Sequence, residues 1–362
     1  ARQDNPELKV FVSGCLPQRY KEEVAELMPE VDRFFYTVDA QQTLQQIKRH
    51  LKTPEIIEST RQLLNSGHYA YLRIAEGCNN RCAYCAIPLI KGDYASRPID
   101  DILHEAEQLA SNGVKEIVVI AQDTTLYGSD LASDASLPSV LAALNKVSGV
   151  EWLRLMYTHP AHWNDKLIDA LCSFEKVVPY FDVPIQHISD PILKNMGRRV
   201  TRSQIEYLIS KVRTRIPNVA LRTSIITGFP GETQEQFQEL LDYLEETRFD
   251  RLGAFTYSHE EGTRAFRLED DISEDVKLDR QRMVMHQQEK IAEELSAAKI
   301  GETLRVLVDE VDVEQNVAIA RSKWDAPEVD GNIFLPTNVL KGEFYNARII
   351  DADIYDLKGE IE

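Results

Sequence analysis

The stretch Gly77-Cys78-Asn79-Asn80-Arg81-Cys82-Ala83-Tyr84-Cys85 places three thiols within eight residues, directly after an alternating apolar run. Soft thiolate sulfur suits iron–sulfur clusters, which are held by cysteines at short spacing. Three cysteines bind three irons of a 4Fe–4S cluster and leave the fourth iron without a protein ligand, and no further cysteine follows until Cys172. A tetrahedral zinc site needs four ligands, so zinc and a set of inert buried thiols are the minor alternatives.

Length and composition set the class of protein. A chain of 362 residues predicts roughly two to three domains of about 100–200 residues each. The 41 basic and 59 acidic residues give a formal charge of −18, which disfavours a nucleic-acid partner. Five cysteines, three of them clustered, do not indicate a disulfide framework, and no apolar run approaches the ~18 residues of a membrane span. We therefore expect a cytoplasmic protein without a membrane partner.

Strand and helix patterns alternate between residues 69 and 257. The expected strands are residues 69–75, 117–121, 152–157, 181–184, 220–227 and 252–257. The expected helices between them are residues 100–112, 137–147, 164–174, 201–216 and 233–246. Continuous apolar runs such as 117–121 are typical of parallel strands covered on both faces. Six strand–helix repeats predict an α/β fold with a partial (βα)6 barrel.

Smaller units are expected on both sides of this barrel. Residues 8–13 and 31–37 are expected strands and residues 18–28 and 43–51 expected helices, the remnant of an α/β domain whose beginning we expect upstream of Ala1. A polar helix at 276–299, with Val284, Ile291 and Leu295 on one face, is typical of a connector. Short alternating segments at 304–308, 317–320, 333–335 and 345–350 predict a small antiparallel β barrel. The expected domains are residues 1–52, a linker at 53–67, the partial barrel at 68–275, a connecting helix at 276–300 and the β barrel at 301–362.

The cysteine spacing resembles that of the radical S-adenosylmethionine (SAM) enzymes, whose usual core is a six-repeat partial barrel. The resemblance implies that Cys78, Cys82 and Cys85 hold a 4Fe–4S cluster and that the amine and carboxylate of SAM bind its open iron. An electron from the cluster then cleaves SAM to a 5′-deoxyadenosyl radical. The resemblance also implies that Tyr84 lies near the adenine, where the alternative is an ordinary core tyrosine.

In a barrel of parallel strands the site lies at the C-terminal ends of the strands. Gln122 and Asp123 follow the second strand, where many radical SAM enzymes hold the SAM amine; helix capping is the alternative for both. Gln186 and Ser189 follow the fourth strand and could reach a ribose or a carboxylate. His187 between them is either a proton carrier or a structural hydrogen-bonding group.

Arginines and glycines complete the candidates. One of Arg198 and Arg199 could clamp the SAM carboxylate, because the guanidinium fork fits a carboxylate; a solvated arginine pair is the alternative. Gly228 follows the fifth strand, where the superfamily binds the adenine part of SAM, and allows close backbone approach; a plain turn is the alternative. Cys172 lies on the apolar face of an expected helix, which indicates packing.

Several stretches resemble the methylthiotransferase branch of the radical SAM enzymes, over nearly the whole chain. They are residues 78–85, Ile87-Pro88, Lys91-Gly92, Ser96-Arg97, 186–198 and 223–232. Residues 121–128, 253–263 and 326–331 resemble the members that modify a ribosomal protein rather than those that modify tRNA. The resemblance implies transfer of a methylthio group to the β-carbon of an aspartate in small-subunit ribosomal protein twelve. Methylthiolation of a tRNA adenosine is the first alternative, and a catalytically silent ribosome-binding scaffold is the second.

Residues 14–20, Gly-Cys-Leu-Pro-Gln-Arg-Tyr, resemble the end of the family's N-terminal domain. In the family that domain holds a second, auxiliary 4Fe–4S cluster with three cysteines. Only Cys15 matches one of them, so the resemblance implies that Cys15 is an auxiliary ligand in the full protein, with a buried strand-end thiol as the alternative. The resemblance further implies sulfur from the auxiliary cluster, a methyl group from a second SAM and a reductant such as flavodoxin.

The expected β barrel, which resembles the family's TRAM domain, is acidic. From Ala298 onward seven basic residues stand against fourteen acidic ones, a net charge of −7. Such a charge repels phosphates and attracts a basic ribosomal protein. We expect Trp324 to be an apolar docking anchor surrounded by Asp325, Glu328 and Asp330, with a core tryptophan as the alternative.

Overall fold

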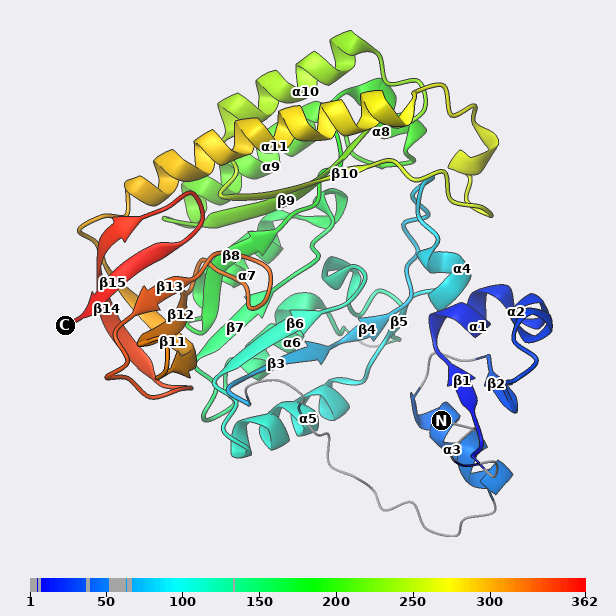
Figure 1. Cartoon of the computed structure of the whole chain (residues 1–362), viewed down its shortest axis with the longest axis horizontal. Helices are drawn as coiled ribbons and strands as arrows, with labels where there is room; N and C mark the ends of the chain where they lie inside the picture. Colours follow the sequence, from blue (N-terminus) through cyan, green and yellow to red (C-terminus); the bar gives the residue numbers. More distant parts are fainter. Residues whose placement is uncertain (1–4, 6–7, 37–39, 52–62, 64–66, 133) are drawn as a thin grey trace.

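The computed structural model describes residues 5, 8–36, 40–51, 63, 67–132 and 134–362. The expected linker at 53–67 lies outside the described residues apart from Leu63 and Gly67. Figure 1 shows a small N-terminal unit, a central α/β unit and a C-terminal β barrel along the chain.

A six-stranded sheet forms the centre of the molecule. Its strands are all parallel and follow each other in sequence order, β3-β6-β7-β8-β9-β10. They are β3 (Tyr69–Arg73), β6 (Glu116–Ile120), β7 (Trp152–Leu155), β8 (Val177–Asp182), β9 (Ala220–Thr227) and β10 (Arg251–Thr256). The predicted partial (βα)6 barrel is therefore confirmed. Strand β8 begins four residues earlier than expected, since Pro179 lies inside it where the pairing with β7 is irregular.

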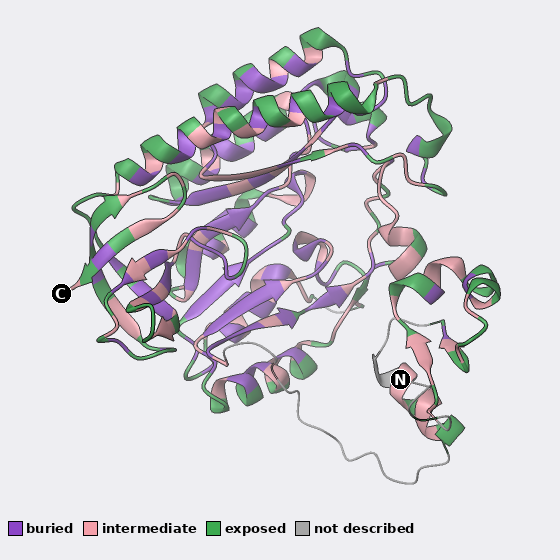
Figure 2. Cartoon of the chain, viewed as in Figure 1, coloured by how far each residue is buried: buried purple, intermediate pink, exposed green. Residues whose placement is uncertain are grey.

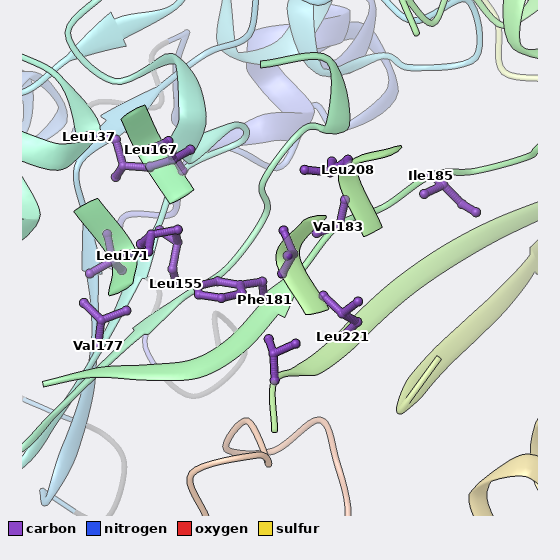
Figure 3. Close-up of a cluster of buried hydrophobic side chains, with 14 of the residues drawn as sticks. Leu137, Leu155, Leu167, Leu171, Val177, Phe181, Val183, Ile185, Leu208 and Leu221 are labelled. Carbon is purple, nitrogen blue, oxygen red and sulfur yellow. The ribbon is translucent and has the colours of Figure 1, made fainter. Parts of the chain in front are cut away.

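Helices cover the outer face of the sheet (Figure 1). They are α5 (Ile99–Ser111), α6 (Leu137–Leu144), α7 (Asp165–Ser173), α9 (Arg202–Arg215), α10 (Gln234–Thr247) and α11 (Glu274–Ala297). Thr201 and Thr233 begin α9 and α10 with capping boxes, so the helix starts follow from local sequence. Between helices and sheet lies the main core, drawn in Figure 3 around Leu155 and Phe181. Strands β6, β7 and β8 are buried almost throughout, whereas the edge strand β10 is largely part-exposed (Figure 2).

Helix α11 does more than connect two domains. It packs against β9, β10 and α10 and buries Val284 and Ile291, so it takes the place of the sixth helix of the barrel. Its polar face is partly buried too, because Gln288 donates to the backbone oxygen of Phe249 at 2.9 Å.

A short ribbon fixes the base of the cysteine loop. Strand β4 (Ala75–Glu76) pairs antiparallel with β5 (Ala95–Ser96), and α4 (Ile87–Lys91) follows Cys85. Gly77 has φ +78°, and a Cβ there would lie 2.1 Å from the carbonyl oxygen of Asp93. Only glycine lets the two arms of the loop approach so closely.

The N-terminal unit contains two parallel strands, β1 (Phe11–Ser13) and β2 (Arg33–Phe35). The single helix expected at 18–28 is two helices, α1 (Cys15–Tyr20) and α2 (Glu22–Leu27), because Lys21 between them adopts φ 47°. A third helix, α3, spans Ala40–Leu51. Helix α1 contacts α4, so this unit lies beside the cysteine loop.

The C-terminal strands close into a five-stranded barrel in the order β11-β12-β13-β15-β14. They are β11 (Thr303–Asp312), β12 (Val317–Ser322), β13 (Ile333–Leu335), β14 (Phe344–Ala352) and β15 (Leu357–Ile361). The prediction found the first four. Strand β15 reads LKGEI, and its polar residues hide the alternation that would mark it as a strand.

The loop 323–331 faces the central sheet, and the prediction of a docking surface there is wrong. Asp325 is 4% exposed and pairs with Arg251 at the start of β10. Asp330 accepts a 2.6 Å hydrogen bond from the Tyr180 hydroxyl, and Trp324 Nε1 donates to the Asn218 carbonyl at 2.7 Å. Tertiary partners, which no local pattern reveals, occupy Asp325 and Asp330, whereas Glu328 stays exposed and accepts a 2.6 Å hydrogen bond from the Tyr69 hydroxyl. The loop instead covers the sheet at the N-terminal ends of its strands, away from the cysteine loop.

Candidate functional site

A cavity of about 770 Å³ lies at the C-terminal ends of the strands. Seven of the predicted site residues line it: Cys78, Cys82, Tyr84, Cys85, Gln122, Gln186 and Arg198. They come from loops after β3, β6 and β8 and from the segment after α8 (Asp190–Asn195). The topology therefore gathers at one place residues that are up to 120 positions apart in the sequence.

Backbone hydrogen bonds hold the cysteine loop from outside. Ala83 N–H donates to the Met196 oxygen at 2.7 Å, and Ala265 N–H donates to the Ala83 oxygen at 2.8 Å. Burial raises the pKa of the Cys78 thiol to about 11 and also raises that of Cys85. Thiols in such surroundings are nucleophilic or ligating only when a cation stabilises the thiolate. The loop thus suits a metal centre better than a free reactive cysteine.

Arg198 is the buried cation next to these thiols. Its Nη1 lies 3.7 Å from Cys82 Sγ, and its Nη2 donates to the Pro184 carbonyl. Burial disfavours its charge, but Tyr84 and Cys82 oppose that effect and leave the Arg198 pKa raised. Arg198 therefore stays charged in a fixed orientation. Its neighbour Arg199 is exposed and does not line the cavity.

Three buried polar atoms in the cavity lining have no partner among the described residues. They are Gln122 Oε1, His159 Nε2 and Arg198 Nε. Buried polar atoms are nearly always hydrogen-bonded, so three of them in one cavity indicate a polar ligand. Gln186 adds a strained backbone with φ 70°, a feature that concentrates at functional sites.

Asp123 does not line the cavity but lies directly behind the cysteine loop. It accepts hydrogen bonds from Asn80 Nδ2 at 2.6 Å, from His162 Nδ1 at 2.9 Å and from Thr125 N–H at 3.0 Å. Burial works against its charge, yet the hydrogen bond and the charge of His162 lower the Asp123 pKa. The capping alternative is the geometry found, because Asp123 caps a 3-10 turn at Thr124–Leu126. Asp123, His159 and His162 also cluster within 4.8 Å, but hydrogen bonds already occupy both carboxylate oxygens of Asp123.

Two further candidates lie outside the cavity lining. Ser189 is buried at the start of α8, where its N–H donates to His187 Nδ1 at 3.0 Å. A Cβ on Gly228 would lie 2.3 Å from Lys277 Cγ, so this glycine makes room for α11. Both residues support neighbouring elements in this structure.

Other residues of the lining were not among the candidates. They include Arg73, Tyr157, His159, Asp182, Arg222, Ser224, Phe255 and Glu260. Asp182 accepts from Arg222 Nη1 at 2.9 Å and from Tyr157 N–H at 3.2 Å, and burial raises its pKa. A charged residue inside an otherwise apolar strand is the signal that identifies such a pair, since buried charges are expensive unless paired.

The two remaining cysteines are exposed. Cys15 begins α1, which contacts α4 near the cysteine loop. Cys172 lies on α7 with its Sγ 3.5 Å from the Arg215 carbonyl, so it does not pack in the core as expected. Among the described residues we find no helix with the length and apolarity to cross a bilayer.

Comparisons with known proteins agree with the geometry. Residues 72–244 match the radical SAM superfamily and residues 300–361 match the TRAM domain. The chain is 45% identical over 358 residues to the ribosomal protein uS12 methylthiotransferase RimO of Thermosipho africanus, covering 98% of this chain and 83% of that protein. It is 43% identical to the protein of the same name from Clostridioides difficile, covering 97% and 82%. The cobalamin-dependent SAM radical enzyme OxsB, with aqua-cobalamin bound, shares the fold alone, at TM-score 0.51, 13% identity and coverage of 79% of this chain and 45% of that chain.

Proposed function

The chain belongs to the RimO family of radical SAM methylthiotransferases, and from this membership we propose how its own residues serve the reaction. It is an enzyme that transfers a methylthio group to ribosomal protein uS12. We take the acceptor to be the β-carbon of an aspartate of uS12. A ribosomal substrate supports a cytoplasmic location for the reaction.

Family membership implies a 4Fe–4S cluster and SAM, and the cavity suits both. Cys78, Cys82 and Cys85 would hold the cluster, because three thiols of one loop line one cavity. When bound, the cluster would supply an electron for cleavage of one C–S bond of SAM, which gives methionine and a carbon radical that can remove hydrogen from an unactivated C–H bond.

The polar lining would hold SAM. Arg198 offers a fixed guanidinium for its carboxylate, and Gln122 offers an unpaired amide oxygen for its amine. Gln186 lines the same cavity and could bond the ribose, while Tyr84 offers an aromatic face for the adenine. The assignments of Arg198 and Gln122 rest on their unpaired polar atoms beside the three thiols, and those of Gln186 and Tyr84 rest on their place in the lining.

Apolar side chains make up another part of the wall. Ile87, Ile90, Ile120, Ile226 and Phe255 line the cavity. They exclude water from this part of the cavity, which strengthens the electrostatic contacts that the polar lining makes with a bound ligand.

The auxiliary cluster is a further part of the proposal. Cys15 would be one of its ligands, supported by its exposed thiol on a helix that contacts α4. A three-cysteine site of this kind needs two more thiols, and within the printed sequence only Cys172, on the outer helix α7, remains. This polypeptide should thus reconstitute with about four irons rather than about eight, one cubane per cysteine triplet.

The test is anaerobic reconstitution followed by iron and sulfide analysis, and then SAM cleavage with dithionite as reductant. We expect about four irons per chain and formation of 5′-deoxyadenosine. Added uS12 should raise the rate of SAM consumption, and added tRNA should not. A preparation that retains no iron would support the scaffold alternative. Faster SAM consumption with tRNA than with uS12 would favour the tRNA alternative.

A further inference from the structure

Four exposed cations lie on the outer side of the cysteine loop. Arg81, Lys194, Arg199 and Arg264 line an open surface pocket of about 600 Å³, and we name them the cationic patch. The whole chain carries a formal charge of −18. Four cations around one pocket therefore stand out against the average charge of the molecule.

The cationic patch is built on the segments that hold the cysteine loop. Arg264 Nη2 donates to the Arg81 carbonyl at 2.9 Å, next to the bond between Ala265 and Ala83. On the other side Gly197 packs under Arg264, because a Cβ there would lie 2.2 Å from Arg264 Nη2. The Arg264 guanidinium and the backbone of Arg81 are thus fixed in position relative to the thiols.

Only a thin layer separates the cationic patch from the cavity. Asn80 and Arg198 line both the surface pocket and the cavity. Arg198 Nη1 lies 3.7 Å from Cys82 Sγ, and Arg199 follows it at the surface. One layer of side chains therefore stands between a docked molecule and the thiol.

Few acids neutralise these charges. Asp93 lies 3.7 Å from Arg81, and both side chains are largely exposed. Asp190 also lines the pocket, but its Oδ1 accepts the N–H of Arg202 at 2.7 Å. Lys194 and Arg199 have no side-chain hydrogen bond or ion pair within the part of the chain that the structure describes.

We propose that the cationic patch is the docking surface for an acidic one-electron carrier protein, such as a reduced flavodoxin. The inference rests on the proposed function, since it assumes a cluster on Cys78, Cys82 and Cys85. In the step one electron leaves the carrier's flavin hydroquinone, which becomes a semiquinone, and enters the oxidised cluster, with no bond formed or broken. Electron transfer weakens steeply with distance, so the carrier has to dock where the protein layer is thin.

Charge complementarity supports this choice of partner. An acidic carrier is repelled by most of a protein with charge −18, so a local cationic field both steers its approach and fixes its orientation. Ribosomal RNA also carries negative charge and is the competing occupant. The thin layer over Cys82 favours the electron carrier, because RNA binding gives no reason for the patch to lie there.

The experiment compares two double variants of the reconstituted protein. Lys194→Glu/Arg199→Glu reverses two cations of the patch that have no side-chain partner. The control, Lys146→Glu/Lys290→Glu, makes the same change of net charge away from the patch. Lys146 is an exposed residue that follows α6, and Lys290 is an exposed residue on α11. Calorimetry measures flavodoxin binding, and stopped-flow spectroscopy measures cluster reduction by flavodoxin hydroquinone and by dithionite.

For the patch variant we expect flavodoxin binding and cluster reduction to weaken about tenfold or more at low salt, with a smaller salt dependence than the parent. The control variant should change either quantity by about twofold or less, and dithionite should reduce all three proteins at the same rate. Equal flavodoxin binding by both variants would overturn the proposal. So would a patch variant that loses affinity for ribosomal RNA while its flavodoxin kinetics stay those of the parent. If the parent itself forms no cluster, the proposed function fails instead, and the binding measurement still reports on the surface.

Discussion

Arg321 joins the β barrel to the central sheet through a buried ion network, and its replacement by methionine gives a sharp test. The Arg321 side chain is 2% exposed, and its Nη1 lies 2.8 Å from Glu116 Oε2, which is fully buried. Its Nε and Nη2 bind Asp309 at 2.5 and 2.9 Å. Methionine keeps much of the volume of the Arg321 side chain but removes the positive charge that Glu116 and Asp309 share.

The expected cost follows from what remains after the change. Glu116 keeps Arg154 Nε at 2.7 Å, and Asp309 keeps His68 Nε2 at 2.7 Å. Removing one partner from a buried ion pair typically costs about 3–5 kcal/mol. Lys115→Met is the matched control, since its partner Glu343 crosses the same interface at 2.6 Å but is 51% exposed. An exposed pair of this kind contributes only about 0.2–1 kcal/mol.

Urea unfolding followed by tryptophan fluorescence measures the difference. Trp152 and Trp324 both lie at the interface, and the Trp152 ring is 4.8 Å from that of Phe344. The Arg321→Met transition should move to clearly lower urea than that of Lys115→Met. If the two variants unfold within about 1 kcal/mol of each other, the buried network does not hold the barrel to the sheet.

Three other changes test the site and its surroundings. Cys82→Ala should abolish SAM cleavage whereas Cys172→Ala should leave it intact, and 5′-deoxyadenosine formed by Cys82→Ala under reducing conditions would disprove the cluster assignment. Burial lowers the pKa of His159 from 6.5 to about 2, so the folded state binds fewer protons than the unfolded state between these values and stability falls as the pH drops through 6.5. The loss between pH 7 and pH 5 should be on the order of 2 kcal/mol and should disappear in His159→Gln; equal acid sensitivity of both proteins would contradict a neutral buried imidazole. Gly228→Ala should cost about 1–3 kcal/mol because its φ is +72° and its Cβ would meet Lys277, while the KM for SAM stays within about twofold; a large rise in that KM without loss of stability would restore Gly228 to the binding site.

Local sequence patterns were sufficient to predict the central fold and the cysteine loop. Strand β9 is found at the expected residues 220–227, a segment rich in β-branched residues that is followed by Gly228. The capping boxes at Thr201 and Thr233 fix two helix starts in the same local way. The triplet Cys78, Cys82 and Cys85 could also be predicted from local sequence, because the three thiols belong to one short loop and line one cavity.

Contacts between distant residues decided what the sequence could not predict. Asp123 lies directly after a buried strand, as a ligand-binding residue would, yet His162 and Asn80 occupy its carboxylate. Asp182 and Arg222 were missed for the opposite reason, because each lies inside a strand and becomes part of the cavity only when β8 and β9 pair. Asp182 and Arg222 are 40 positions apart in the sequence, so no local pattern shows that they pair.

The position of the β barrel limits how a ribosomal protein can be bound. Loop 323–331 covers the N-terminal ends of the strands, whereas the cysteine loop follows the C-terminal end of β3. Strand β9 has eight residues, which at about 3.3 Å each separate the two ends by roughly 26 Å. A substrate attached to exposed acids of the barrel such as Glu310 and Glu314 therefore needs a projecting segment to reach the cavity. The N-terminal unit lies at the cavity end instead, where Arg19 pairs with Glu260 of the lining. A target residue near the tip of an extended loop can enter the cavity while the rest of the substrate binds the barrel. A target residue on a compact face cannot do both.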